Sequence, residues 1–274
     1  MVNYGFILLP LYIYPGPNGA NWTKLYNAAK AYPSLNFQAV INVENGPGGG
    51  CPNSETAYAV NKLHSYTNVQ TLGYVHTASR YDCGPEGKWI CPATQDVSAV
   101  KANITSWQNW SKCSTSQDLH MDGIFFDEAP TVAANISYMK ILTTFAKNTL
   151  TKGPKTTLFN AGNPVDAGYW AIADYINVFE GTEAAYYAAD IGALDGGGLY
   201  SQQTTLLIHS YTDPASNVYK DVNTIISLNN DAIAGLFISS IEPSDISDPY
   251  IAFSPLWPTF TADMFNVTKA NAGG

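Results

Sequence analysis

Eight short runs of β-branched and aromatic residues recur along this chain, separated by longer stretches with helical periodicity. The runs cover residues 4–10, 37–43, 70–76, 123–127, 157–160, 175–179, 205–210 and 235–241. They are continuously apolar, which is typical of parallel strands covered on both faces. Strands that alternate with helical segments predict β/α units. Eight such units predict an α/β fold of the closed (β/α)8 TIM type.

Helical spacing between the strands supports this prediction. Apolar residues recur at that spacing before Thr151 and again after strand seven, at Val132, Ile136, Met139 and Phe145 and at Val218, Val222, Ile225 and Ile226. The main alternative is an open doubly wound sheet, but no Gly-x-Gly-x-x-Gly joins a strand to a helix. The 274 residues, 46% of them hydrophobic, suffice for one large core. We therefore expect one domain spanning residues 1–274.

Four cysteines and five glycosylation sequons indicate an oxidising compartment outside the cytosol. No C-x-x-C pair and no histidine at zinc-ligand spacing occurs, so two disulfides are favoured over a metal site. Of the three connectivities, we expect Cys83 with Cys91, closing a short loop, and Cys51 with Cys113. The sequons begin at Asn21, Asn103, Asn109, Asn135 and Asn266. We expect a secreted or cell-surface protein, with any membrane anchor in a segment that precedes this sequence.

The charge and the hydropathy exclude two classes of partner. A formal net charge of −9 argues against nucleic acid, which is bound by basic surfaces. No apolar run approaches the ~20 residues of a membrane-spanning helix. The acidic balance suits a neutral or cationic partner, although solubility alone also accounts for it.

The most informative motif is Gly123-Ile124-Phe125-Phe126-Asp127-Glu128, in which an apolar strand runs into two adjacent carboxylates. The active site of a β/α barrel lies at the carboxyl ends of its strands. Consecutive strand residues face opposite ways, so both carboxylates can serve one site only if the chain turns there. Glu180 follows strand six in the same manner. Two strand-end carboxylates are what glycoside hydrolysis needs. The simpler alternatives are a helix N-cap at Asp127 or Glu128 and a salt bridge at Glu180.

Other polar side chains at predicted strand ends are candidates for substrate binding: His76, Asn160, His209, Tyr211 and Glu242. The two histidines could serve a mononuclear metal site, but strand one has no His-x-His pair, and we expect no metal. Ser-His-Asp chemistry lacks its Gly-x-Ser-x-Gly elbow. The glycine-rich segment 46–50 is expected to line the rim of an open groove.

Three segments resemble one family, the spherulin-four glycoside hydrolases of filamentous fungi (glycoside hydrolase family 135). They are the motif at 123–128, Asn177-Val178-Phe179-Glu180-Gly181 and Ile7-Leu8-Leu9-Pro10-Leu11-Tyr12, and the resemblance runs the whole length. It implies a (β/α)8 barrel that cleaves galactosaminogalactan, an α-1,4-linked exopolysaccharide of biofilms, within its N-acetylgalactosamine stretches. The family's acidic triad corresponds to Asp127, Glu128 and Glu180. We expect a monomer that needs a polysaccharide substrate but no cofactor and no obligate protein partner.

The roles of these carboxylates can be assigned in outline. We expect Asp127 as nucleophile, Glu180 as general acid/base and Glu128 as an orienting neighbour, with Asp127 and Glu128 exchangeable. Retention of anomeric configuration is expected because strands four and six allow the ~5–5.5 Å spacing of retaining enzymes, although side-chain lengths also permit inversion. Two other functions fit the same sequence. They are a metal-dependent polysaccharide deacetylase and a non-catalytic carbohydrate-binding wall protein.

Overall fold

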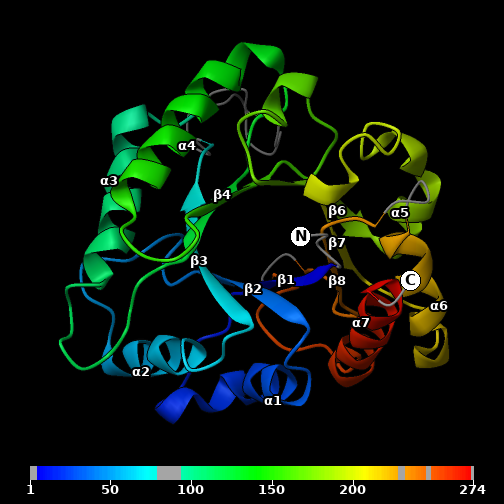
Figure 1. Cartoon of the computed structure of the whole chain (residues 1–274), viewed down its shortest axis with the longest axis horizontal. Helices are drawn as coiled ribbons and strands as arrows, with labels where there is room; N and C mark the ends of the chain where they lie inside the picture. Colours follow the sequence, from blue (N-terminus) through cyan, green and yellow to red (C-terminus); the bar gives the residue numbers. More distant parts are fainter. Residues whose placement is uncertain (1–4, 79–93, 228–231, 245–247, 273–274) are drawn as a thin grey trace.

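Eight parallel strands form a closed barrel in which each strand pairs with the next and β8 pairs with β1. The computed structural model describes residues 5–78, 94–227, 232–244 and 248–272. The strands are β1 (Phe6–Leu11), β2 (Asn36–Ile41), β3 (Val69–His76), β4 (Gly123–Asp127), β5 (Thr156–Asn160), β6 (Tyr175–Thr182), β7 (Thr204–His209) and β8 (Gly235–Ile238). Helices lie around the outside of these strands (Figure 1). The predicted TIM-type barrel is confirmed, and each predicted strand is present with ends that differ by a few residues.

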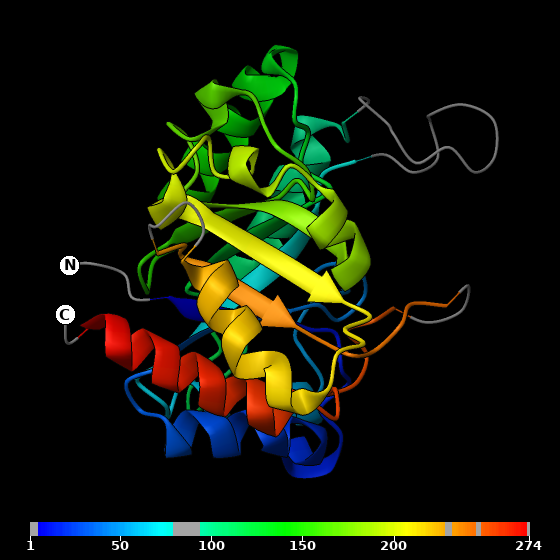
Figure 2. The ribbon, with the colours of Figure 1, turned by 90° about the vertical axis from the view of Figure 1, so that its right-hand side faces the viewer.

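The connecting segments are mostly helical. The α-helices are α1 (Thr23–Ala31), α2 (Ser54–Leu63), α3 (Val97–Trp110), α4 (Ile136–Thr149), α5 (Glu183–Ala188), α6 (Val218–Ile226) and α7 (Trp257–Ala272). Short 3-10 turns are η1 (Pro17–Trp22), η2 (Ala133–Asn135), η3 (Ala167–Tyr169), η4 (Ile191–Ala193), η5 (Ser201–Gln203) and η6 (Ala215–Asn217). The link from β5 to β6 is described throughout and holds only η3. The last helix, α7, packs beside α6 (Figure 2).

Two strand glycines leave room for aromatic side chains, one outside the barrel and one inside it. Alternation along β3 turns Gly73 outward, and a Cβ there would lie 2.7 Å from the Trp107 ring of α3. The same indole donates its Nε1 hydrogen to the Tyr74 carbonyl at 2.8 Å. Inside the barrel, Phe6 packs edge-on against Tyr175 with ring centroids 4.9 Å apart. A Cβ on Gly235 would lie 2.5 Å from the Phe6 ring, so glycine leaves the room that this ring fills. The rings of Phe6 and Tyr175 therefore occupy the barrel interior at the amino ends of β1 and β6.

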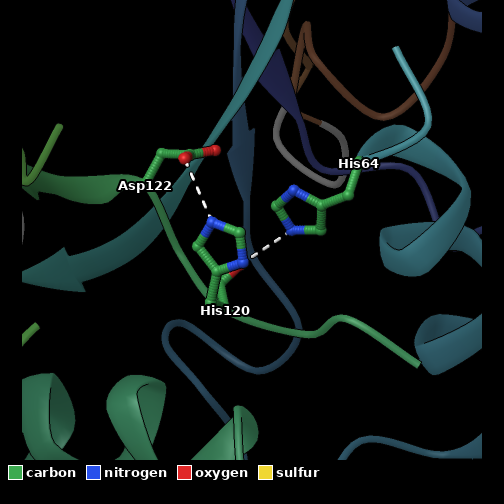
Figure 3. A group of neighbouring side chains, drawn as sticks. All are labelled: His64, His120 and Asp122. Atoms are coloured by element: carbon green, nitrogen blue, oxygen red, sulfur yellow. Dashed lines mark hydrogen bonds and ion pairs between the residues drawn. The ribbon is translucent and has the colours of Figure 1, made fainter. Parts of the chain in front are cut away.

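A network of histidines and carboxylates lies at the amino end of β4 (Figure 3). The two ring nitrogens of His120 bond to Asp118 at 2.7 Å and to Asp122 at 3.2 Å. Its ring stacks on that of His64, with centroids 4.2 Å apart. Asp122 also accepts a hydrogen bond from the Thr71 backbone N–H at 2.8 Å. The network thereby links the end of α2 to the start of β4 and to β3.

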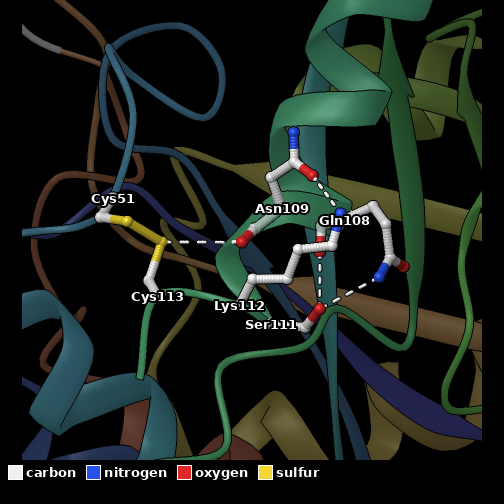
Figure 4. The surroundings of a disulfide bond; sticks show 6 residues. All are labelled: Cys51, Gln108, Asn109, Ser111, Lys112 and Cys113. Carbon is white, nitrogen blue, oxygen red and sulfur yellow. Dashed lines mark hydrogen bonds between the residues drawn. A yellow bond between two sulfur atoms is a disulfide. The ribbon is translucent and has the colours of Figure 1, made fainter. Parts of the chain in front are cut away.

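A disulfide joins Cys51, in the segment after β2, to Cys113, just beyond α3, with a Cα separation of 5.6 Å (Figure 4). This half of the predicted connectivity is confirmed. Cys83 and Cys91 lie outside the described residues. The asparagines of all five sequons are at least partly exposed, and Asn103 and Asn109 lie on α3. Among the described helices, none has the length and apolar character needed to cross a bilayer.

Candidate active site

A turn in the backbone places two consecutive carboxylates at the carboxyl end of β4. Asp127 is the last residue of β4, and Glu128 follows it with a φ of 51°. That left-handed conformation costs a residue with a Cβ roughly 1–2 kcal/mol. The Thr77 hydroxyl donates to both residues' carbonyl oxygens, at 2.8 Å to Asp127 and 3.0 Å to Glu128, which holds the turn in place. The structure therefore has the chain turn that the sequence motif required.

One amide bridges Asp127 and Glu180. The Nδ2 of Asn160, at the end of β5, donates to Asp127 Oδ1 and to Glu180 Oε2, both at 2.7 Å. Its Oδ1 accepts a hydrogen bond from the buried Asn177 amide at 2.7 Å. Because that oxygen is already used as an acceptor, the NH2 group of Asn160 must face the carboxylates. A side chain chosen from strand-end position thus lies between the two acids.

An irregularity in β6 brings Glu180 to this side of the sheet. The pairing of β6 with β7 shifts between Asn177 and Phe179, so that Asn177 pairs with Thr205 and Glu180 with Leu207. In a regular strand, residues three apart face opposite ways. The extra residue of a bulge changes that phase, and Asn177 and Glu180 both reach Asn160. The predicted strand ended at Phe179, whereas β6 continues to Thr182.

Three tyrosines surround the acids. Tyr74 donates its hydroxyl hydrogen to Asp127 Oδ2 at 2.6 Å, and Tyr250 donates to Glu180 Oε1 at 2.8 Å. Tyr12 packs edge-on against both rings, with centroid distances of 5.6 Å to Tyr74 and 5.7 Å to Tyr250. Sequence reasoning assigned none of the three to the site. Tyr74 and Tyr12 stand at strand ends and could have been found, whereas Tyr250 lies in the segment between β8 and α7, twelve residues beyond the end of β8.

Burial and mutual repulsion set the protonation of the two acids. Burial, reinforced by the negative charge of Asp127, raises the pKa of Glu180 to about 7, against the hydrogen bonds from Asn160 and Tyr250. Burial also raises the pKa of Asp127, and hydrogen bonds from Tyr74 and Asn160 oppose that rise. The pair can therefore hold one proton near neutral pH, on Glu180, while Asp127 is ionised. This is the division between acid and nucleophile that glycoside hydrolysis uses.

Glu128 is held by a separate group of residues. Its Oε2 lies 2.8 Å from His76 Nε2, and Gln95 Nε2 lies 3.0 Å from His76 Nδ1. An amide nitrogen only donates, so Nδ1 is the acceptor and Nε2 carries the hydrogen that faces Glu128. His76, predicted to bind substrate, therefore contacts the predicted triad directly.

The remaining predicted residues lie apart from these contacts. His209 pairs with the neighbouring Ser210 hydroxyl at 3.0 Å, and Glu242 is exposed to solvent. Tyr211 is buried and donates its hydroxyl hydrogen to Asp221 of α6 at 2.6 Å. Among the described residues, no hydrogen bond or ion pair joins these three to Asp127, Glu128 or Glu180. Their role in binding stays a prediction.

Comparisons with known proteins agree with the sequence and the fold. The model of spherulation-specific family 4 matches residues 6–264. Spherulin-4 of Physarum polycephalum is 32% identical over 174 residues, which is 64% of this chain and 44% of that protein. The chain thus spans less than half the length of that curated relative.

Two solved structures are similar over almost the whole chain. The crystal structure of Aspergillus clavatus Sph3 in complex with GalNAc has a TM-score of 0.80 and 28% identity, covering 95% of this chain and 97% of that one. A chitinase from Chromobacterium violaceum ATCC 12472 has a TM-score of 0.53 and 11% identity, covering 95% and 99%. At that identity the chitinase shows a shared fold alone.

Proposed function

The chain belongs to spherulation-specific family 4, and from that premise we propose that it is a secreted enzyme that cuts within α-1,4-linked N-acetylgalactosamine stretches of galactosaminogalactan. The structural match to Sph3 supports a carbohydrate-active glycosidase. GalNAc is the sugar in the Sph3 complex, which favours an N-acetylgalactosamine polymer as the substrate. The observation that carries the proposal is the bridge from Asn160 to Asp127 and Glu180.

In the proposed reaction, Glu180 protonates the leaving oxygen while Asp127 attacks the anomeric carbon. The raised pKa of Glu180, about 7, suits the first role. The hydrogen bonds from Tyr74 and Asn160 to Asp127 suit the second, because they favour an ionised carboxylate. In the next step water would attack the anomeric carbon and release Asp127 as a carboxylate, and Glu180 would take the proton from that water.

The same bridge supports the proposal that anomeric configuration is retained. Two oxygens that each lie 2.7 Å from one nitrogen are held close together. Retaining enzymes place their carboxyl groups ~5–5.5 Å apart, whereas inverting enzymes need ~6.5–9.5 Å to admit a water. The short bridge supports retention and favours Asp127 over Glu128 as the nucleophile, because Glu128 bonds to His76 instead.

The deciding experiment offers four purified polymers, galactosaminogalactan, chitin, α-glucan and galactan, and measures new reducing ends. We expect cleavage of galactosaminogalactan alone, with oligosaccharides rather than single sugars as early products if the glycine-rich segment 46–50 lines an open groove. Glu180→Gln should lower kcat by about 10³-fold, the size of a general-acid contribution. Asp127→Asn should be at least as severe. Asp190→Asn, on an exposed residue that has no part in the proposed reaction, is the matched control.

The same assay separates the two rival functions. A polysaccharide deacetylase would release acetate without new reducing ends and would lose activity with a chelator. A non-catalytic wall protein would bind polymer and release nothing. Cleavage of chitin with galactosaminogalactan left intact would refute the substrate, and full activity of Glu180→Gln would refute the mechanism.

A further inference from the structure

Three carboxylates that the proposed reaction does not use meet where β6 and β7 leave the barrel. Glu183 is the first residue of α5, Asp213 lies in the segment after β7, and Asp221 lies on α6. One carboxylate oxygen of each lies within 4.8 Å of the other two. Glu183 and Asp221 are each only 7% exposed. Within the described part of the chain, no Lys, Arg or His forms an ion pair with any of the three.

One oxygen of Glu183 has no hydrogen-bond partner. Its Oε2 accepts from the backbone N–H and the hydroxyl of Thr212, both at 2.9 Å. Its Oε1 is buried and accepts from no donor among the described residues. Most buried polar atoms are paired, and an unpaired carboxylate oxygen is costly. Because an oxygen of this carboxylate lies within 4.8 Å of those of Asp213 and Asp221, the unpaired oxygen indicates a missing ligand there.

We propose that Glu183, Asp213 and Asp221 bind a structural calcium ion. The ligand atoms are all oxygens, which hard cations prefer. Calcium binds oxygen at about 2.3–2.6 Å, so two ligands on one ion are at most about 5 Å apart. Magnesium, at about 2.0–2.1 Å, would need them within about 4 Å. The three ligand oxygens all lie within 4.8 Å of one another, which calcium can span without movement of the side chains, and a divalent charge offsets the carboxylates.

This ion would stabilise the side of the barrel rim that carries Glu180, the proposed general acid. Glu183 lies three residues after Glu180, at the start of α5, and Asp221 is fixed by Tyr211, whose hydroxyl donates to it at 2.6 Å. A cation shared by the three residues would hold α5, the segment after β7 and α6 together. It would contact neither Asp127 nor Glu180 and so take no part in bond cleavage. A three-carboxylate site open on the side of the exposed Asp213 suits the weak affinity of extracellular modules, ~10⁻⁴–10⁻³ M.

Thermal unfolding tests the site on the intact protein without reference to activity. After treatment with EDTA and removal of the chelator, the midpoint is measured with 10 mM CaCl2, with 10 mM MgCl2, and with NaCl at matched ionic strength. Calcium should raise Tm by about 5 °C, and the other salts should do much less. Tb3+ is the second probe, because Tyr211 hydrogen-bonds Asp221 and would sensitise its luminescence.

Conservative variants distinguish specific calcium binding at this site from a general effect of salt on repulsion between carboxylates. Asp213→Asn and Glu183→Gln should each weaken calcium binding at least tenfold and remove most of the Tm rise. The control Asp190→Asn removes one exposed carboxylate and should respond to calcium like the wild type. Equal stabilisation by calcium and sodium, or an unchanged calcium response in both variants, would overturn the proposal. Loss of polymer cleavage would not, since the ion is independent of the proposed reaction.

Discussion

At the scale of single residues, Asn160 couples the protonation of Asp127 to that of Glu180. Its amide donates to both acids, and both donations lower the acids' pKa values against the effect of burial. Asn177 fixes the direction of that amide. The acids are therefore tuned as a pair by a neutral residue that does not itself exchange protons.

The pH profile of cleavage should show this coupling. Activity requires ionised Asp127 and protonated Glu180, so kcat/KM should rise as pH passes the raised pKa of Asp127 and fall above about pH 7. Asn160→Ala removes a donor from both acids, so both limbs should move to higher pH. A variant that was merely unstable would lose rate with its profile unmoved. Initial rates between pH 4 and pH 9 distinguish the two outcomes.

At the scale of elements, the segment that enters β4 is held by a charged network as well as by the buried side chains of Leu119 and Met121. Hydrogen bonds, first to Asp122 and then to Asp118, raise the pKa of His120. Burial and the neighbouring His120 charge lower the pKa of His64. Asp118, bonded to His120 and Lys152, has its pKa lowered to about 2. The folded state therefore favours one imidazolium, on His120, beside one neutral ring.

Replacing His120 should change stability in a pH-dependent way. A raised folded pKa contributes stability that is fully present below the unfolded value of about 6.5 and is lost as pH rises through the folded pKa. The difference in unfolding free energy between wild type and His120→Gln should thus be largest near pH 5 and shrink above pH 7. Urea denaturation at several pH values measures it. A difference that grows with pH would show that His120 is neutral in the fold.

At the scale of the whole molecule, sequence periodicity was enough to predict the barrel but not all residues of its candidate active site. Parallel strands buried on both faces leave long apolar runs, so all eight strands could be located, and Asp127 and Glu180 followed from their ends. The bulge at Asn177 and Phe179 left no such signal, because one extra apolar residue does not interrupt an apolar run. Tyr250 hydrogen-bonds Glu180 although 70 residues of sequence separate them, and no pattern in the sequence around Tyr250 indicates that contact.

The disulfide should contribute to the stability of the whole chain. Cys51 and Cys113 are separated by 62 residues, and closing a loop of that length in the unfolded chain is worth about 4 kcal/mol in the chain-entropy estimate. The double variant Cys51→Ala, Cys113→Ala should therefore unfold at lower urea concentration, with the barrel's circular dichroism kept. The wild type under reducing conditions is the comparison. An unchanged midpoint would mean that the unfolded chain gains no freedom when the bond is removed.

The left-handed backbone at Glu128 creates a trade-off between thermal stability and catalytic activity. Glycine adopts a φ of 51° without the steric cost that any Cβ incurs, so Glu128→Gly should be about 1 kcal/mol more stable than Glu128→Ala. Both variants lack the carboxylate that faces His76 and should be equally impaired in cleavage. Selection for heat resistance alone would favour glycine here and lose activity, whereas selection for polymer breakdown keeps the strained acid.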